Sequence, residues 1–141
     1  MKLGNIGFDA SGKFKLFDFG LATTLTQEKR VAPNQYKLTG FTGTRRYMAP
    51  EIFKCTPYGK PADVYSFCVV LWEIMSLKPA FADESEESLK NNVHGEMNFR
   101  PIVKKKWPPP FQKLVHDSWA ADASVRPSFV DIQAILEKSE I

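Results

Sequence analysis

The chain has 141 residues, of which 43% are hydrophobic and 25% are charged, a composition typical of one folded domain or of part of a larger one. A net charge of +3 is too weak to indicate nucleic acid as a partner. The longest apolar run, FCVVLW, is far shorter than the ~20 residues that span a bilayer, and no apolar signal segment follows Lys2. We therefore expect an intracellular, cytoplasmic protein with no nucleic-acid or membrane partner.

Cysteine and histidine are sparse and scattered. Cys55 and Cys68 form no disulfide framework and fit a reducing compartment. Together with His94 and His116 they show no metal-ligand spacing, so no zinc site is expected.

The first part of the chain has the pattern of two short strands. Residues 5–10 and 13–19 are joined by DASGK, whose Gly12 can adopt the positive φ that a tight hairpin turn needs. Residues 20–46 then carry Thr, Gln, Asn, Gly and Pro without sustained periodicity, which predicts a long loop. A loop of this length inside a compact domain is usually functional or disordered.

From Pro50 onward the patterns are helical, and the segment PADVYSFCVVLWEIMS is the most informative. At ~100° per residue, Asp63, Ser66 and Glu73 fall on one polar stripe of residues 61–76, and almost every other side chain is apolar. A helix that is apolar nearly all round is buried on most sides. We therefore expect residues 61–76 to form the central helix of the molecule.

Three further helices are predicted after the central one. The segment DESEESLKNNV carries acids in its first turn, where the helix dipole favours negative charge. FQKLVHDSWA and PSFVDIQAILEK each place apolar side chains on one face: Phe111, Leu114, Val115 and Trp119 in the first, and Phe129, Ile132 and Leu136 in the second. The sequence therefore predicts an α+β fold, mostly helical, in which a small N-terminal β-hairpin and a long loop precede a helical bundle.

Four motifs occur in order along the chain. KLFDFGLA places Asp18 at the end of an apolar strand, where an acid is costly to bury unless a cation or hydrogen-bond donors meet it. GTRRYMAPE follows at residues 43–51, DVYSFCVVLWEI at residues 63–74 and SWAADASVRPSF at residues 118–129. Alone, Asp-Phe-Gly would indicate only a strand-ending turn. Followed across a long loop by Ala-Pro-Glu it forms the ordered pair of protein kinases, and the chain resembles a eukaryotic protein kinase domain over essentially its whole length.

The resemblance implies a site for ATP and Mg²⁺. In the family, the acid matching Asp18 holds magnesium against the ATP phosphates, and the residue matching Asn5 holds a second metal ion. Lys2 matches the catalytic-loop lysine of Ser/Thr-type kinases, which steadies the transferred phosphoryl group, although Leu3 replaces the proline that usually follows it. Thr44 matches the threonine that supports the catalytic aspartate and shapes the peptide site.

Three more residues match structural positions of the family. Glu51 is expected to pair with Arg126 across the base of the helical lobe, and removal of one partner from such a buried pair should cost roughly 3–5 kcal/mol. Asp63, near the start of the central helix, would hold backbone amides of the catalytic loop. On local grounds Asp63 fits equally well as an acid that simply begins a helix.

The resemblance also divides residues 1–141 into parts of a kinase domain. The end of the catalytic loop and the metal-binding hairpin come first, the activation segment spans residues 18–51, and the helical C-terminal lobe spans residues 52–141. Thr39 and Thr42 are expected phosphorylation sites, because a phosphate there could order the loop by pairing with arginines. The alternative is that both are ordinary loop hydroxyls.

The start of the chain bears on activity. In the family the catalytic aspartate precedes the catalytic-loop asparagine by five residues, which here is the position before Met1. The glycine-rich loop and the rest of the N-terminal lobe would lie further upstream and are not in this sequence. Because phosphoryl transfer depends on positioning and charge stabilisation, we expect this partial domain to be inactive alone and to bind neither ATP nor Mg²⁺ tightly.

Two functional interpretations stay open. The first is part of a protein Ser/Thr kinase that phosphorylates protein substrates, supported by the retained Lys2, Asn5, Asp18 and Thr44. The second is a truncated kinase-like module that docks a protein partner without catalysis, through an apolar surface left exposed on the central helix. A third interpretation, a purely structural helical domain, is weakly supported because it would make the order of the four motifs a coincidence. The residues of the last two motifs most resemble those of the tyrosine-kinase-like branch of Ser/Thr kinases.

Overall fold

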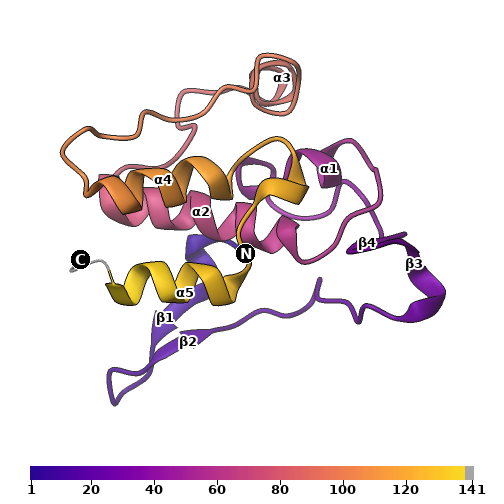
Figure 1. Cartoon of the computed structure of the whole chain (residues 1–141), viewed down its shortest axis with the longest axis horizontal. Coiled ribbons are helices and arrows are strands. Elements are labelled where there is room, and N and C mark those ends of the chain that lie inside the picture. The colour runs from indigo at the N-terminus through magenta and orange to yellow at the C-terminus, as the bar shows by residue number, and fades with distance from the viewer. Residues whose placement is uncertain (139–141) are drawn as a thin grey trace.

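A computed structural model describes residues 1–138 and confirms the α+β arrangement, with more helix than sheet (Figure 1). The elements are, in chain order, η1 (Leu3–Asn5), β1 (Ile6–Phe8), β2 (Phe14–Leu16), η2 (Gln27–Lys29), β3 (Arg30–Ala32), β4 (Gln35–Tyr36), η3 (Arg45–Tyr47), α1 (Pro50–Phe53), α2 (Pro61–Ser76), α3 (Glu86–Ser88), η4 (Leu89–Val93), α4 (Pro109–Ser118), η5 (Ala123–Val125) and α5 (Phe129–Lys138).

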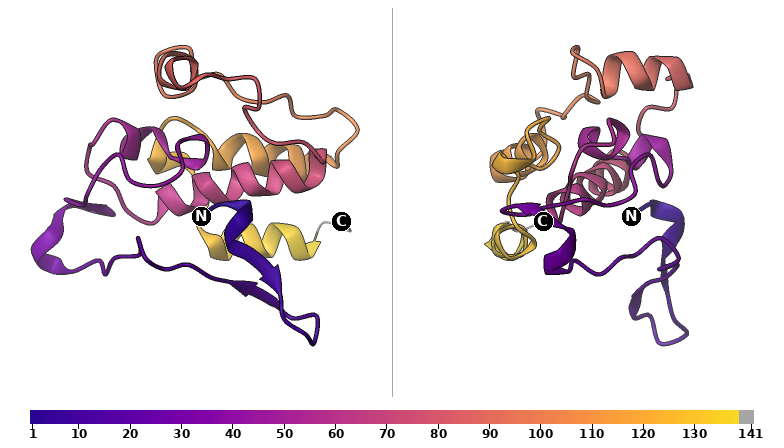
Figure 2. Two further views of the ribbon diagram at one scale, coloured as in Figure 1. Left: turned by 180° about the vertical axis from the view of Figure 1, so that it is seen from behind. Right: turned by 90° about the vertical axis from the view of Figure 1, so that its right-hand side faces the viewer.

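The helices are arranged around α2. In Figure 1, α2 runs through the middle of the molecule with α4 alongside it, and α5 lies on the side that also carries the β1–β2 hairpin. The segment containing α3 lies on the opposite side, which both views in Figure 2 also show. The hairpin and the long segment after it therefore extend from one face of a helical body.

The N-terminal hairpin forms where the sequence predicts it, but with shorter strands. The β1 and β2 strands pair antiparallel over three residues each, with Phe8 opposite Phe14. Gly12 has a φ of 77°, as the tight turn requires. The Asp9 carboxylate accepts hydrogen bonds from the backbone N–H groups of Ser11 and Lys13, so the turn takes up residues that the sequence assigned to the strand ends.

The prediction of a continuous loop over residues 20–46 is wrong in part. This segment contains a second antiparallel pair, β3 and β4, and Tyr36 also makes a bridge to Tyr58. Gly59 lies against this pair so closely that a Cβ there would come within 2.4 Å of the Asn34 backbone oxygen. The segment is thus tied to the chain just before α2 by backbone contacts.

The central helix α2 has the predicted bounds and is buried along most of its length. Tyr65, Val69 and Trp72 pack in one core cluster with side chains of α4, including Phe111 and Val115. We expected an exposed apolar surface on this helix, and that surface is small. Among the large apolar side chains of α2, Ile74 is the one that is exposed to solvent. Apolar exposure is concentrated instead on the β1–β2 hairpin and the residues after it.

The later helices follow the predicted faces, with two differences. On α4 and just after it, all four predicted apolar residues are buried: Phe111, Leu114, Val115 and Trp119. On α5 Ile132 is buried, but Phe129 is partly exposed and touches Phe67 edge-on. The helix predicted for DESEESLKNNV is split into the short α3, which Ser85 caps, and a π-type turn, η4.

Among residues 1–138, no helix has both the length and the apolar character that a membrane crossing requires.

Candidate functional site

A cavity of about 480 Å³ gathers the chemistry-bearing residues that the motifs single out. Its walls come from the N-terminal segment, the end of β2 with the residues after it, the segment before η3, and the start of α2. It is lined by all the residues predicted to act in catalysis, cofactor binding or metal binding, together with the acid of the central helix: Lys2, Asn5, Asp18, Thr44 and Asp63.

The β1–β2 pairing brings Asn5 next to Asp18. Ile6 is opposite Leu16, so the residue before β1 and the residues after β2 are neighbours. The Phe17 backbone N–H donates to the Asn5 carbonyl oxygen at 3.0 Å, which extends the ladder by one bond. A carboxylate and an amide oxygen thus face one cavity from two paired strands.

Asp18 has an unusual backbone conformation. Its φ is 64°, in the left-handed region that few residues other than glycine adopt. Gly20, two residues later, keeps an ordinary φ and donates its N–H to the Asp18 carboxylate at 3.4 Å. Such strain in a non-glycine residue is concentrated at functional sites. The Asp18 side chain itself is exposed to the cavity.

Lys2 and Thr44 line this cavity from two separate segments of the chain. Lys2 is extended and half-buried, and its carbonyl oxygen accepts from the Asn5 N–H at 3.0 Å in the η1 turn. Thr44 precedes η3, and its carbonyl oxygen accepts from the Tyr47 N–H at 3.0 Å. Both residues line the cavity, which therefore gathers an ammonium and a hydroxyl together with Asp18 and Asn5.

The two expected phosphorylation sites differ in surroundings. Thr42 lines the cavity, and its hydroxyl donates to the Gly40 carbonyl oxygen at 3.0 Å. Thr39 lies outside the cavity lining and is exposed, while its carbonyl oxygen accepts from the Tyr58 hydroxyl at 2.8 Å. The Thr39 hydroxyl is therefore the more accessible of the two.

Asp63 lies at the first turn of α2, at the edge of the same cavity. Within the described part of the chain its carboxylate has no hydrogen-bond partner, so the expected bonds to catalytic-loop amides are not formed there. The N-terminal segment contacts α2 one turn later, where the Met1 amino group donates to the Ser66 hydroxyl at 3.2 Å. Burial, and then the Asp63 charge, raise the pKa of Tyr58.

Glu51 and Arg126 form a two-pronged ion pair away from the cavity. The Arg126 Nη1 and Nη2 atoms lie 2.7 and 2.9 Å from Oε1 and Oε2 of Glu51. The Arg126 side chain is fully buried and also donates to the carbonyl oxygens of Pro61, Ala120 and Ala121. The pair therefore joins α1, α2 and the segment before α5.

Two buried polar residues were not predicted. Glu73 accepts hydrogen bonds from the Tyr47 hydroxyl and the Ala80 N–H, both at 2.8 Å. Burial, and then this carboxylate, raise the pKa of Tyr47 to about 12. The sequence did carry a signal for the burial of Glu73, because this acid lies within an apolar helix. His94, which lines a second cavity, had no such signal, because the Phe53 ring on which it stacks is distant in the sequence.

The oxygen donors at the main cavity suit a hard cation. Across residues 1–138 there is no group of three or more His, Cys, Asp or Glu side chains placed to hold a metal ion. Asp18 and Asn5 instead offer one carboxylate and one amide oxygen at the same cavity. Mg²⁺ is commonly held by one or two protein oxygens, with water and substrate phosphates completing its octahedron. The donor set therefore fits magnesium bound together with a phosphate-bearing substrate.

Comparisons with known proteins agree with the motifs. The protein kinase domain family model matches residues 1–138. The chain is 40% identical over 126 residues to serine/threonine-protein kinase VIK of Arabidopsis thaliana, a match that covers 88% of the chain and 28% of that relative. It is 36% identical over 138 residues to the RGS domain-containing serine/threonine-protein kinase A of Dictyostelium discoideum, with 97% and 11% covered.

A third relative is the serine/threonine/tyrosine-protein kinase HT1 of Arabidopsis thaliana, which is 33% identical over 138 residues. The match covers 98% of the chain and 33% of HT1, so the chain spans a third or less of the length of these relatives. With the family model matching nearly every residue, the chain belongs to the protein kinase domain family.

Proposed function

We propose that the chain supplies the metal-binding and substrate-facing half of an ATP-dependent protein serine/threonine kinase. The observation that carries the proposal is the gathering of Lys2, Asn5, Asp18 and Thr44 around one cavity. These side chains provide a cation, oxygen ligands and a hydroxyl in one place. Phosphoryl transfer needs little else from the protein than positioning and charge stabilisation.

Each residue has a distinct part in this proposal. Asp18 and Asn5 would hold Mg²⁺, which neutralises charge on the ATP phosphates when bound. The Lys2 ammonium would stabilise negative charge on the transferred phosphoryl group. Thr44 would help to position the acceptor hydroxyl of a protein substrate. The strained backbone at Asp18 keeps its carboxylate turned toward the cavity.

The finer assignments belong to the same proposal. Residues 18–51 act as the activation segment, with Thr39 as the first and Thr42 as the second phosphorylation site, because the Thr39 hydroxyl is exposed. The similarity to VIK and HT1 and the wording of the last two motifs favour the tyrosine-kinase-like branch and Ser/Thr acceptors. An intracellular, cytoplasmic location fits the two free cysteines.

Residues 1–141 contain no residue at the position of the catalytic base, so we infer that they do not catalyse transfer without an upstream segment. The alternative function is a kinase-like module that docks a protein partner. The two proposals differ in whether the cavity supports phosphoryl transfer once an upstream segment supplies the catalytic base.

A chimera tests this difference. The upstream part of the VIK kinase domain, through its catalytic aspartate, is joined to residues 1–141, and transfer of phosphate from ATP to a Ser/Thr acceptor protein is measured. We expect transfer by the chimera and none by residues 1–141 alone. Asp18→Asn should lower the rate of the chimera by roughly 10²–10³. The matched control Asp9→Asn, in the hairpin turn outside the cavity, should keep it.

A folded chimera without transfer would overturn the kinase proposal and leave the docking module. Equal rates in the Asp18→Asn and Asp9→Asn chimeras would show that the cavity is not the site of the chemistry. Folding is monitored by far-ultraviolet circular dichroism, so that a misfolded chimera is recognised and remade with a different junction.

A further inference from the structure

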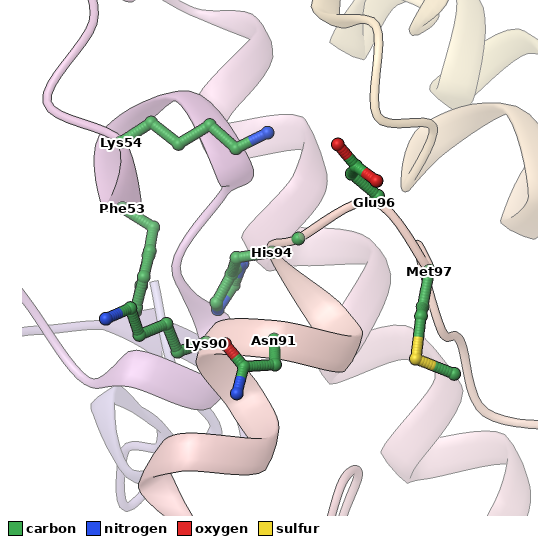
Figure 3. A pocket seen from close by; sticks show the side chains of 8 residues that line it. Phe53, Lys54, Lys90, Asn91, His94, Glu96 and Met97 are labelled. Carbon is green, nitrogen blue, oxygen red and sulfur yellow. The ribbon is translucent and has the colours of Figure 1, made fainter.

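A second cavity, of about 490 Å³, shares no lining residue with the first. It is formed between the end of α1 and the η4 turn with the loop that follows. Figure 3 shows its side chains, with the His94 ring near the centre of the group. Its lining residues are Phe53, Lys54, Lys90, Asn91, His94, Gly95, Glu96 and Met97.

The His94 ring forms part of the wall of this cavity and leaves its polar atoms unpaired. The side chain is 1% exposed and stacks on Phe53 with a ring-centroid distance of 4.3 Å. Neither ring nitrogen has a hydrogen-bond partner among the described residues. Buried polar atoms are nearly always paired, and an unpaired one costs roughly 1–3 kcal/mol. His94 therefore presents an unmet hydrogen-bonding capacity beside a cavity.

The protonation state of His94 determines whether its ring nitrogens donate or accept hydrogen bonds. Burial lowers the pKa of His94 to about 4, and the Arg100 and Lys54 charges act in the same direction. The Arg45 backbone, which approaches the ring without a hydrogen bond of normal geometry, and the Glu51 carboxylate act in the opposite direction. The ring is therefore neutral near pH 7, with one N–H donor and one acceptor nitrogen. A peptide group, which carries both a carbonyl oxygen and an N–H, can pair with either.

The rest of the cavity is apolar in its wall and cationic at its rim. Phe53 and Met97 provide apolar surface, while Lys54 and Lys90 provide two ammonium groups against the single carboxylate of Glu96. The excess of positive charge favours a ligand with carboxylates. An apolar side chain seated on the Phe53 ring with acidic residues on either side matches both features.

The backbone keeps this cavity in shape. The η4 turn is a π-type turn, a form that often occurs at functional sites. Gly95 closes it so tightly that a Cβ there would lie 2.1 Å from the Asn91 carbonyl oxygen. The cavity is also joined to the segment before α1, because the Phe53 ring contacts Phe41 edge-on at 5.1 Å. A ligand on Phe53 would therefore lie next to residues 18–51.

From this geometry we propose that the cavity between α1 and η4 is a docking site for a protein segment that carries an apolar residue flanked by acidic residues. The apolar side chain packs on Phe53, a backbone peptide group pairs with His94, and the flanking carboxylates approach Lys54 and Lys90. Binding at this site needs neither ATP nor metal, so it can be tested separately from phosphoryl transfer.

The test uses the 141-residue chain labelled with ¹⁵N and the peptide acetyl-Glu-Glu-Phe-Glu-Glu-amide as the probe. Nuclear magnetic resonance titration should show saturable shifts of amide signals at residues 53–54 and 90–97. Peptides with Ala for Phe, or with Lys for every Glu, are the matched probes, and we expect each to bind at least about tenfold more weakly. Inorganic phosphate serves as the probe for a simple anion site.

Three variants separate docking from folding. Lys54→Glu should weaken binding of the acidic peptide about tenfold, whereas Lys13→Glu, an exposed lysine in the hairpin turn, should leave it unchanged. His94→Phe keeps the ring stack and removes the unpaired nitrogens, so it should raise the thermal midpoint while weakening the peptide severalfold. No saturable shift, equal binding of the lysine peptide or of phosphate, or an unchanged affinity in His94→Phe would each overturn the proposal.

Discussion

At the scale of single residues, Arg126 shows how much one buried side chain can connect. It pairs with Glu51 through two hydrogen bonds and donates to three backbone carbonyl oxygens from two other segments. Its guanidinium also lies 5.2 Å from the centre of the Tyr65 ring in the core. Loss of this side chain would leave a nearly buried carboxylate without its arginine partner and would remove hydrogen bonds to three carbonyl groups.

The variant Arg126→Ala should therefore lower the free energy of unfolding by roughly 3–5 kcal/mol. Urea unfolding followed by tryptophan fluorescence measures the change. The control is Lys113→Ala, which removes an exposed pair with Asp117 at 2.6 Å and should cost less than about 1 kcal/mol. Similar losses in both variants would show that the buried pair contributes no more than a surface pair.

The burial of His94 should make the stability of the chain depend on pH. Its pKa is about 4 in the folded chain and near the ordinary 6.5 once unfolded, so the unfolded state binds more protons between these values. The free energy of unfolding should fall as the pH drops from 6.5 toward 4, by at most about 3 kcal/mol and by less where solvent reaches the ring. In His94→Phe this part of the slope should be absent. Parallel curves for the two proteins would contradict the assignment to His94.

The sequence predicted these residues unequally. Glu51 and Arg126 are 75 positions apart, and only the order of the motifs suggested that they meet. The motifs likewise identified Asp18, but not its left-handed backbone, because a positive φ at a residue other than glycine has no signal in the local sequence. His94 could not be identified, since its burial depends on Phe53 and on a π-type turn that its local sequence does not indicate.

At the scale of elements, α2 could be predicted to the residue, because its apolar pattern and its N-terminal proline depend on the local sequence alone. The β3–β4 pair could not, because its strands have three and two residues and depend on a bridge from Tyr36 to Tyr58. The division of the segment before α4 into α3 and η4 could not be predicted from the sequence either. The locally encoded elements were predictable, and those held by distant contacts were not.

The end of α2 gives a prediction at this scale. Leu77 ends the helix with a φ of 55°, and its side chain is 89% exposed. A left-handed conformation costs an L-residue roughly 1–2 kcal/mol, and glycine avoids this cost. Leu77→Gly should therefore raise the free energy of unfolding by up to about 1 kcal/mol, measured by urea unfolding. Leu77→Ala keeps the Cβ and should give no gain, so equal effects of the two variants would argue against backbone strain.

At the scale of the whole molecule, two surfaces with different chemistry stand apart. The main cavity lies among the N-terminal hairpin, the segment between β2 and η3, and α2, whereas the second cavity lies between α1 and η4. Apolar exposure is concentrated on the hairpin side, where large side chains follow one another closely: Phe8, Phe14, Phe17, Phe19 and Leu21. A concentration of exposed apolar side chains of this kind marks a surface that another molecule covers.

The hairpin should therefore make the 141-residue chain associate with itself. Phe8 and Phe14 face each other across the strands with ring centroids 6.2 Å apart, and both are more than half exposed. Replacing both by threonine keeps a residue that favours strands but removes the apolar surface. Sedimentation velocity should show a mass that rises with concentration for the unaltered chain and stays that of a monomer for the double variant.

The control for this experiment is Val130→Thr, which changes an equally exposed apolar side chain on α5, outside the hairpin strands. It should associate as the unaltered chain does, because one isolated apolar residue on a helix is ordinary surface. If the unaltered chain keeps one mass at every concentration, the apolar hairpin does not drive association in water. If Val130→Thr abolishes association as well, the contact also involves α5 and is not confined to the hairpin.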